Sequence, residues 1–200
     1  MLKIGITGGI GSGKSTVAQV FAVLDIPIYQ SDGKAKWLMQ HDPVLKASLM
    51  ENFGNNAYQP NGELNRPYIA EQVFGNKEKL DMLNALVHPA VELDFETWCC
   101  HPERSRRVYI LKEAALLFES GTNKGLDKII AVYAPDELRI KRASERDGIG
   151  EEQVRSRMEN QWPQEEVMRL SDVVIYNDGS QMLIPQVLAI HAQYCGQVSV

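Results

Sequence analysis

Short apolar runs alternate with amphipathic stretches along much of this chain, and the runs have the composition of buried β-strands. They occupy residues 2–7 (LKIGIT), 26–29 (IPIY), 108–111 (VYIL), 128–134 (KIIAVYA) and 172–176 (DVVIY). A run that is apolar on both faces is typical of a strand covered by helices on both sides, as in a parallel sheet. The pattern therefore predicts about five strands in one parallel sheet.

Helical periodicity separates or follows these strands. Val17, Val20 and Leu24 recur at helical spacing after the first strand, and residues 135–146 and 181–194 have the same periodicity. Pro185 is expected to kink or restart the last helix, because proline lacks the N–H that the helix interior needs. The alternation of strand and helix predicts an α/β fold with a doubly wound parallel sheet.

The chain changes character between residue 34 and about residue 100. Short amphipathic helices are predicted there, punctuated by the turn signals DP, GNN, PNG, NRP, GN and HP, with little strand signal. We therefore predict a single domain of about residues 1–32 and 108–200 that carries a helical insertion over about residues 33–107.

Composition places the chain among ordinary globular proteins. Its 200 residues are 44% hydrophobic and 24% charged, which is sufficient for one domain with a sizeable core. The net charge of −5 gives no general attraction to nucleic acid or to an anionic membrane, so neither is expected as a partner. No apolar run approaches the length of about eighteen residues that a membrane span needs, and no signal peptide is visible.

Cysteine usage indicates a reducing compartment. The chain has three cysteines, an odd number, and Cys99 and Cys100 are adjacent, so a disulfide framework is not expected. Zinc binding by this pair with His101 is disfavoured, because adjacent residues rarely converge on one tetrahedral ion. A cytoplasmic location is predicted, with the protein acting as a monomer or a small homo-oligomer.

A glycine-rich segment, ITGGIGSGKST, lies between the first predicted strand and the first predicted helix. Gly8 and Gly13-Lys14-Ser15 match the pattern G-x-x-x-x-G-K-[ST]. Glycines allow backbone N–H groups to curl around an anion, the lysine of the pattern bridges the outer phosphates, and the hydroxyl ligates Mg²⁺. The start of the helix adds a positive dipole end. This context predicts a nucleoside-triphosphate site.

A GTPase switch is one interpretation of such a loop, and two stretches invite it. DGIG at residues 147–150 follows a helix pattern instead of a strand and comes after the other motif, which is the wrong order. NKGLD at residues 123–127 places Leu126 where the base-reading aspartate would be needed. Neither motif has the context that its chemistry requires.

A small-molecule kinase needs an acceptor-activating carboxylate and cations for the transferring phosphoryl group. Asp32 follows the second predicted strand, at the kind of strand end where doubly wound sheets bind ligands, although a helix N-cap is an equally good interpretation. Arg142 and Arg146 lie four residues apart and share a helix face. Arg139 belongs to the same charged run, for which a solvated face is the ordinary interpretation. The polar segment of residues 147–168 suits a helical lid that excludes water.

Several motifs together resemble dephospho-CoA kinases. They are GITGGIGSGKST (5–16), SD (31–32), GELNR (62–66), LNALVHP (83–89), LLFESG (116–121), KRASERD (141–147) and VIYNDG (174–179). The resemblance extends over about residues 2–192. It implies transfer of the ATP γ-phosphate to the ribose 3′-hydroxyl of dephospho-CoA, on a P-loop α/β core with a helical acceptor-binding subdomain and a lid.

The resemblance also implies roles for individual residues. ATP is expected on Gly8, Gly9, Ile10, Gly11, Ser12, Gly13, Lys14, Ser15 and Thr16, with Mg²⁺ on Ser15 and the adenine beside Asn177. The acceptor is expected near Asp32, Arg66, His88, Leu117 and Glu119. For His88, a helix cap or a buried histidine is an equally good interpretation. The catalytic residues are expected to be Asp32, Lys14, Arg142 and Arg146.

Some alternatives stay open at the level of sequence. Either Glu113 or Glu119 could support the site. The basic stretch CCHPERSRR at residues 99–107 departs from the family pattern, and an exposed loop is its simplest interpretation. A contribution to binding the polyphosphate acceptor is the alternative. A kinase of another small acceptor, such as a nucleoside monophosphate, or a nucleotide-dependent switch protein would share the phosphate loop.

Overall fold

The computed structural model describes residues 1–196, which divide into two compact units. The first unit consists of Met1–Gln30 together with the chain from His101 onward, and the second is Ser31–Cys100. Residues 101–107, which the sequence assigned to the insertion, therefore belong to the first unit.

The first unit is built on a parallel five-stranded sheet in the order β2-β3-β1-β4-β5, which confirms the predicted architecture. Its strands are β1 (Leu2–Thr7), β2 (Ile28–Gln30), β3 (Tyr109–Glu113), β4 (Lys128–Tyr133) and β5 (Val173–Tyr176). β2 begins after Pro27, which has no N–H to donate to the ladder. β3 continues past the predicted residue 111 to Glu113, opposite Gln30 in the register.

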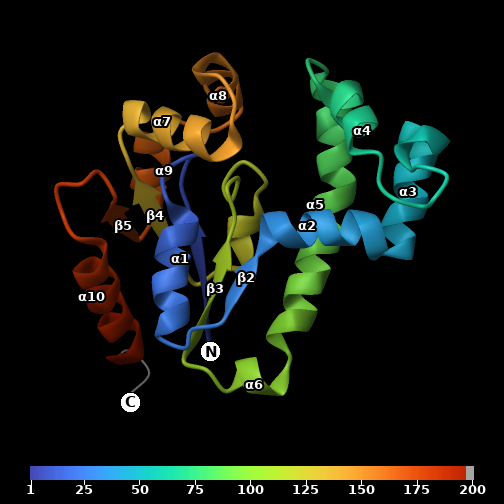
Figure 1. Cartoon of the computed structure of the whole chain (residues 1–200). Helices are drawn as coiled ribbons and strands as arrows, with labels where there is room; N and C mark the ends of the chain where they lie inside the picture. The colour runs from blue at the N-terminus through green and yellow to red at the C-terminus, as the bar shows by residue number, and fades with distance from the viewer. Residues whose placement is uncertain (197–200) are drawn as a thin grey trace. The chain divides into compact units, whose positions relative to one another are not determined.

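Helices cover both faces of the sheet, and Figure 1 shows α1 and α10 on one of these faces. α1 (Lys14–Val23) and α10 (Leu183–Gly196) pack on the same face, where Ile4, Ile6 and Phe21 are fully buried. Residues 114–126 and α9 (Gln164–Leu170) pack on the other face. Pro185 lies in the first turn of α10, so that helix begins there and is not interrupted.

The remaining elements of this unit include α6 (Pro102–Ser105), the 3₁₀ turn η2 (Thr122–Gly125), α7 (Asp136–Asp147) and α8 (Glu151–Met158). α7 and α8 pack through Ile140, Ala143 and Val154, and Ile10 of the glycine-rich segment joins this small cluster. The segment predicted as a lid thus contains α8 and the first part of α9.

The second unit is helical. It contains α2 (Ser31–His41), α3 (Pro43–Phe53), the 3₁₀ turn η1 (Asn55–Ala57), α4 (Arg66–Val73) and α5 (Lys77–Cys99). α5 contacts α2, α3 and α4 and buries Val87, Val91 and Phe95 among them. The sequence predicted several short helices here, but α5 passes through Pro89 without ending. Buried residues on both sides of the proline outweigh the single hydrogen bond that it removes.

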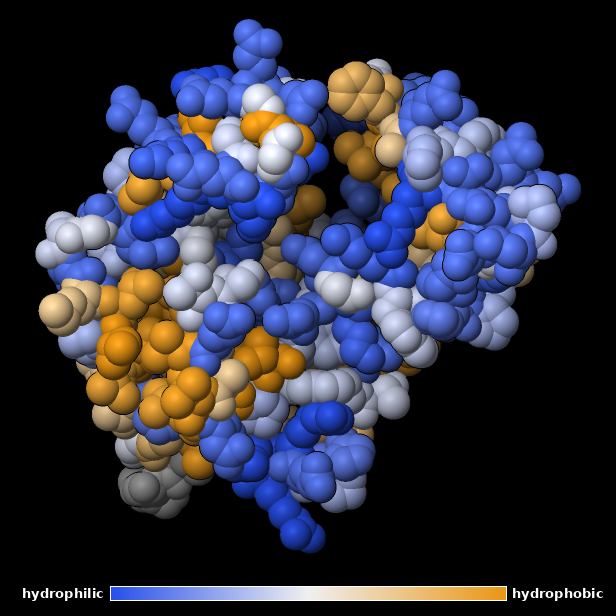
Figure 2. Space-filling model, in the orientation of Figure 1, coloured by the Kyte–Doolittle hydropathy of each residue, from blue (hydrophilic) through white to orange (hydrophobic). Residues whose placement is uncertain are grey.

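The surface is largely polar on the face drawn in Figure 2, with an apolar area at the lower left where α10 lies. Ile184 and Leu188 of α10 and Val23 of α1 are exposed apolar residues of these helices. Among residues 1–196, no helix has both the length and the apolar character of a membrane span.

Candidate phosphate-binding site

The glycine-rich segment forms a tight loop from the end of β1 to the start of α1. Gly11 and Gly13 have left-handed backbone conformations, with φ of 75° and 94°. A loop that mixes left-handed and right-handed residues forms a concave nest of N–H groups, which suits an anion. α1 begins at Lys14, immediately after Gly13, so the positive end of its dipole lies at the same place.

Side chains hold the carbonyl groups of this loop. The Lys14 ammonium donates to the carbonyl oxygen of Gly8 at 2.7 Å and to that of Gly9 at 3.3 Å. The Asn177 amide, from the segment after β5, donates to the carbonyl of Ser12 at 2.8 Å. Carbonyl oxygens repel an anion, so these contacts restrain the groups that would oppose phosphate binding.

Ser12 shapes the loop from within. It is fully buried, its N–H donates to the Gly9 carbonyl, and its own carbonyl accepts from Asn177. Gly13 approaches Asn177 so closely that a Cβ at residue 13 would lie 2.1 Å from the amide nitrogen. The left-handed φ of 94° and this close approach together favour glycine at residue 13.

An oxygen pair that suits Mg²⁺ lies beside the loop. The Ser15 hydroxyl donates to the Glu113 carboxylate at 2.7 Å, which joins the start of α1 to the end of β3. Hydroxyl and carboxylate oxygens are hard ligands, and Mg²⁺ is usually held by one or two such groups together with phosphates and water. Glu119 instead accepts from the N–H of Trp162 at 2.9 Å. Of the two glutamates that the sequence left open, Glu113 is the one beside Ser15.

The predicted cations do not converge on one point. Arg142 donates to the backbone carbonyl of Asn177 at 3.0 Å, whereas Arg146 pairs with Asp147 at 2.8 Å. Arg157 of α8 shares the same carboxylate at 3.0 Å. The hydrogen bond with Arg146 is the main cause that lowers the pKa of Asp147, and it also raises the pKa of Arg146. In this structure Arg146 is therefore engaged at the base of the predicted lid.

Arg139 is a residue of this site that the sequence interpretation missed. It was expected on a solvated helix face, but it is only 4% exposed and donates through Nε to the Ile10 carbonyl at 3.0 Å. Burial lowers the pKa of Arg139, and its pairing with Asp136 opposes that effect. A signal was present, because Arg139 shares a helix face with the apolar Ala143 four residues later.

The predicted acceptor residues have different environments. Asp32 is exposed in the first turn of α2, two residues after the end of β2. Arg66 is exposed at the start of α4, and His88 is half-buried in the middle of α5. Leu117 is fully buried and packs against Gly5 under the sheet, so its side chain serves the core and is unsuited to contact a ligand.

Comparison with known proteins identifies the relatives of this chain. A family model described as dephospho-CoA kinase matches residues 2–182. The dephospho-CoA kinase of Porphyromonas gingivalis is 39% identical over 191 residues, which cover 95% of this chain and 93% of the relative. That of Chlorobium chlorochromatii is 42% identical, with 90% of this chain and 86% of the relative covered. The chain belongs to the dephospho-CoA kinase family.

Solved structures agree with this membership. A crystal structure of a Thermus thermophilus protein has a TM-score of 0.83 and 33% identity, covering 96% of this chain and 97% of the other. The dephospho-CoA kinase from Campylobacter jejuni has a TM-score of 0.71 and 25% identity, covering 98% of each chain. A shikimate kinase from Acinetobacter baumannii, at 15% identity and a TM-score of 0.58, shares the fold. As a dephospho-CoA kinase family member, the protein is a phosphotransferase of coenzyme A biosynthesis with ATP as its co-substrate.

Proposed function

We propose that this protein transfers the γ-phosphate of ATP to the ribose 3′-hydroxyl of dephospho-CoA, giving CoA and ADP. The observation that carries the proposal is the loop between β1 and α1, with its carbonyls restrained and the start of a helix behind it, in a chain of this family. Such a loop binds the phosphates of a nucleotide through its backbone N–H groups.

The ATP phosphates would lie on residues 8–16. Lys14 would leave the carbonyls that it contacts in this structure and bridge the β- and γ-phosphates, because a phosphate carries more charge than a carbonyl. The fully buried Ser12 would contribute through the shape of the loop. The adenine would lie beside Asn177, whose side chain already supports the loop.

Mg²⁺ would be held by the Ser15 hydroxyl, with Glu113 reaching it directly or through water. The two side chains already lie within hydrogen-bond distance. When bound, the ion would neutralise charge on the phosphates as the phosphoryl group moves. Glu119 would act elsewhere, by holding the segment that follows α8.

Asp32 would accept the proton of the acceptor hydroxyl or orient that hydroxyl for attack. Its support is its position just after β2, because the carboxyl ends of parallel strands are where such sheets bind ligands. Arg66 and His88 of the helical unit would bind the acceptor. Arg142 and Arg146 would offset charge in the transition state, after rearranging from their present partners. We further propose a cytoplasmic enzyme that works as a monomer or small homo-oligomer.

The decisive experiment measures ADP formation from Mg-ATP with and without dephospho-CoA, and separately with nucleoside monophosphates. The position of the new phosphate is then established by mass and fragmentation of the product. We expect ADP formation that depends strictly on dephospho-CoA and a product phosphorylated at the 3′-hydroxyl. Turnover with another acceptor would overturn the acceptor assignment. Nucleotide binding with no turnover would indicate a switch protein.

The role of Asp32 is tested by Asp32→Asn, which preserves the size of the side chain and removes its charge. We expect kcat to fall by about 10²-fold or more, the usual scale for loss of a general base, with the affinity for ATP unchanged. Asp81→Asn is the matched control, since Asp81 is an exposed residue of α5 in the same unit. A mutant of Asp32 that turned over as fast as this control would remove Asp32 from the mechanism.

A further inference from the structure

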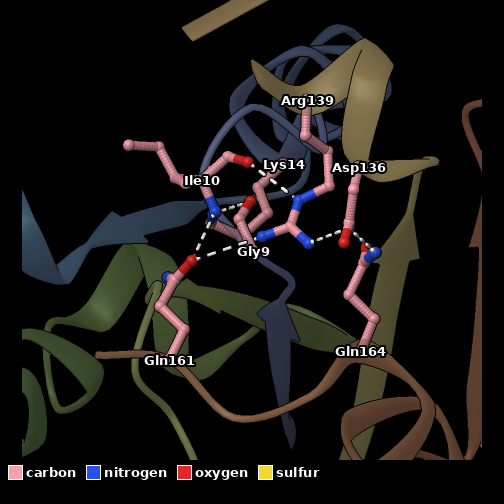
Figure 3. A network of polar contacts seen from close by, with 7 residues as sticks. All are labelled: Gly9, Ile10, Lys14, Asp136, Arg139, Gln161 and Gln164. Carbon is pink, nitrogen blue, oxygen red and sulfur yellow. Dashed lines mark hydrogen bonds and ion pairs between the residues drawn. The ribbon is translucent and has the colours of Figure 1, made fainter. Parts of the chain in front are cut away.

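A network of polar contacts joins the phosphate loop to the second half of the predicted lid segment. Figure 3 shows it between α7, the loop, and the residues that connect α8 to α9. The side-chain oxygen of Gln161 accepts from the backbone N–H of Ile10 at 2.8 Å. The Arg139 guanidinium donates to the backbone carbonyl of Ile10 at 3.0 Å and approaches the Gln161 side-chain oxygen at 3.5 Å. Both polar groups of residue 10 are therefore held by side chains.

The guanidinium of Arg139 is itself fixed in place. It donates to the Asp136 carboxylate at 2.8 Å, and Gln164 donates to the same oxygen at 2.9 Å. It also packs directly on the loop, since a Cβ at Gly9 would lie 1.9 Å from one of its nitrogens. A charged group this deeply buried is retained only where its hydrogen bonds are satisfied, so its geometry is tightly determined.

The residue next to Gln161 is also anchored. The adjacent residue, Trp162, donates its N–H to Glu119 and stacks on Phe118, with ring centroids 6.1 Å apart and planes 8° from parallel. The segment that returns from α8 is thus attached to the body of the first unit at consecutive residues. Gln161 therefore presents its side-chain oxygen to the loop from a segment that is anchored beside it, which suits a residue that positions another.

We propose that Arg139 and Gln161 are positioning residues that hold the Ile10 peptide in the conformation that the nucleotide's outer phosphates require. Neither side chain needs to touch the nucleotide. The inference rests on the proposed function of the loop as the phosphate site, and it deepens that function by naming what sets the loop's affinity. Because these contacts order the loop before the nucleotide binds, binding does not have to pay the entropy cost of ordering it. We therefore expect the contacts to raise the affinity for nucleotide.

Gln161→Met is the sharpest test, because Gln161 is only partly buried and methionine is similar in size. The N–H of Ile10 loses its acceptor, and we expect the Kd for Mg-ADP to rise about tenfold, within the range for an unsatisfied polar group. The Kd for AMP, which lacks the outer phosphates, should stay within about twofold of wild type. Gln161→Glu retains an acceptor for Ile10 and a partner for Arg139, so it should restore binding of Mg-ADP.

The matched control is Gln153→Met, an exposed glutamine of α8 in the same predicted lid. Arg139→Lys, with Arg155→Lys on α8 as its control, tests the second residue, since lysine keeps the charge but cannot reach Ile10 and Asp136 together. We expect Arg139→Lys also to weaken Mg-ADP more than AMP. If Arg139→Lys prevents folding, the comparison of Gln161→Met with Gln161→Glu tests the proposal by itself.

Equal loss of Mg-ADP and AMP affinity in Gln161→Met would overturn the proposal, and so would a lowered melting temperature with unchanged Kd for Mg-ADP. These titrations contain no acceptor. A wild-type protein that binds Mg-ADP but does not turn over dephospho-CoA would therefore overturn only the proposed function. A wild-type protein that does not bind Mg-ADP would overturn both.

Discussion

Gly11→Ala should destabilise this protein because the added Cβ collides with backbone atoms. Gly148→Ala is the control, because Gly148 has a similar φ and no such collision. Gly11 has φ of 75°, and a Cβ built on it would lie 2.1 Å from the backbone carbonyl oxygen of Arg139. Gly148 has a similar φ of 65° at the end of α7, with nothing within 4 Å of its Cβ position. The left-handed conformation costs any L-residue about 1–2 kcal/mol at either position. Only Gly11 adds a collision with backbone.

The collision sets the difference in free energy of unfolding between the two variants. Restoring ordinary contact requires a displacement of roughly 1 Å between the loop and α7, and overpacking of this kind costs about 1–3 kcal/mol. We therefore expect Gly11→Ala to lose about 3 kcal/mol and Gly148→Ala about 1 kcal/mol. For a chain of this size the melting temperatures should fall by about 6–12 °C and about 2–4 °C, respectively.

Thermal unfolding followed by circular dichroism, with and without Mg-ADP, measures both effects. Gly11→Ala should also lose most of the stabilisation that Mg-ADP gives, because the loop that binds it has moved, whereas Gly148→Ala should keep that stabilisation. Equal falls in melting temperature for the two variants would refute the reasoning, since the close approach to Arg139 would then contribute nothing.

Three further predictions concern single charged groups. Lys14→Met should raise the KM for ATP at least about tenfold in steady-state assays, because the charge that bridges the phosphates is lost; an unchanged KM would contradict the loop assignment. Glu113→Gln should raise the Mg²⁺ concentration for half-maximal activity by about tenfold, the scale of lost support for a metal ligand, whereas Glu145→Gln on the exposed face of α7 should not. Burial acts to raise the pKa of Asp172, but its contacts with Lys128 and the N–H of Ile129 outweigh this effect and lower it. The ionised Asp172 therefore stabilises the fold above about pH 4, and this stabilisation is lost as pH falls through the folded-state pKa. Asp172→Asn should lower the melting temperature at about pH 7 and lower it less at about pH 3. An equal fall at both pH values would argue against the ion pair.

The sheet could be predicted because its strands are short, continuous apolar runs, which are typical of parallel strands covered on both faces. The boundaries were less accurate where the deciding groups are backbone atoms. β3 extends through the polar Lys112 and Glu113, because its partners β1 and β2 continue alongside it, and a hydrophobicity pattern does not contain that information. The same extension brings Glu113 beside Ser15, which is why the sequence alone left two glutamates open.

The phosphate loop could be predicted from its glycines and lysine, but the hydrogen bonds that support it could not, although Asn177 was expected at the site beside the adenine. Arg139, Gln161 and Asn177 lie 129 to 165 residues from the loop atoms that they contact, so no local pattern links them. Charged and amide side chains on helices and turns are usually solvated, and that ordinary expectation was wrong for Arg139. At Pro89 in α5 the error was of the opposite kind. The proline predicted an interruption of the helix, but buried contacts on both sides of it keep the helix continuous.

The bond between Asn177 and Ser12 has a consequence for how the protein is made. The two residues are 165 positions apart, and β1 sits in the sheet between β3 and β4, which are both synthesised much later. At ordinary rates of translation the amino-terminal loop waits roughly 10–30 s for its last support to leave the ribosome. A nascent chain that ends before β5 therefore presents an exposed strand and an unfinished nest. Until residue 177 is available the loop lacks this support, so we expect nucleotide to stabilise the completed chain more than the partly synthesised one.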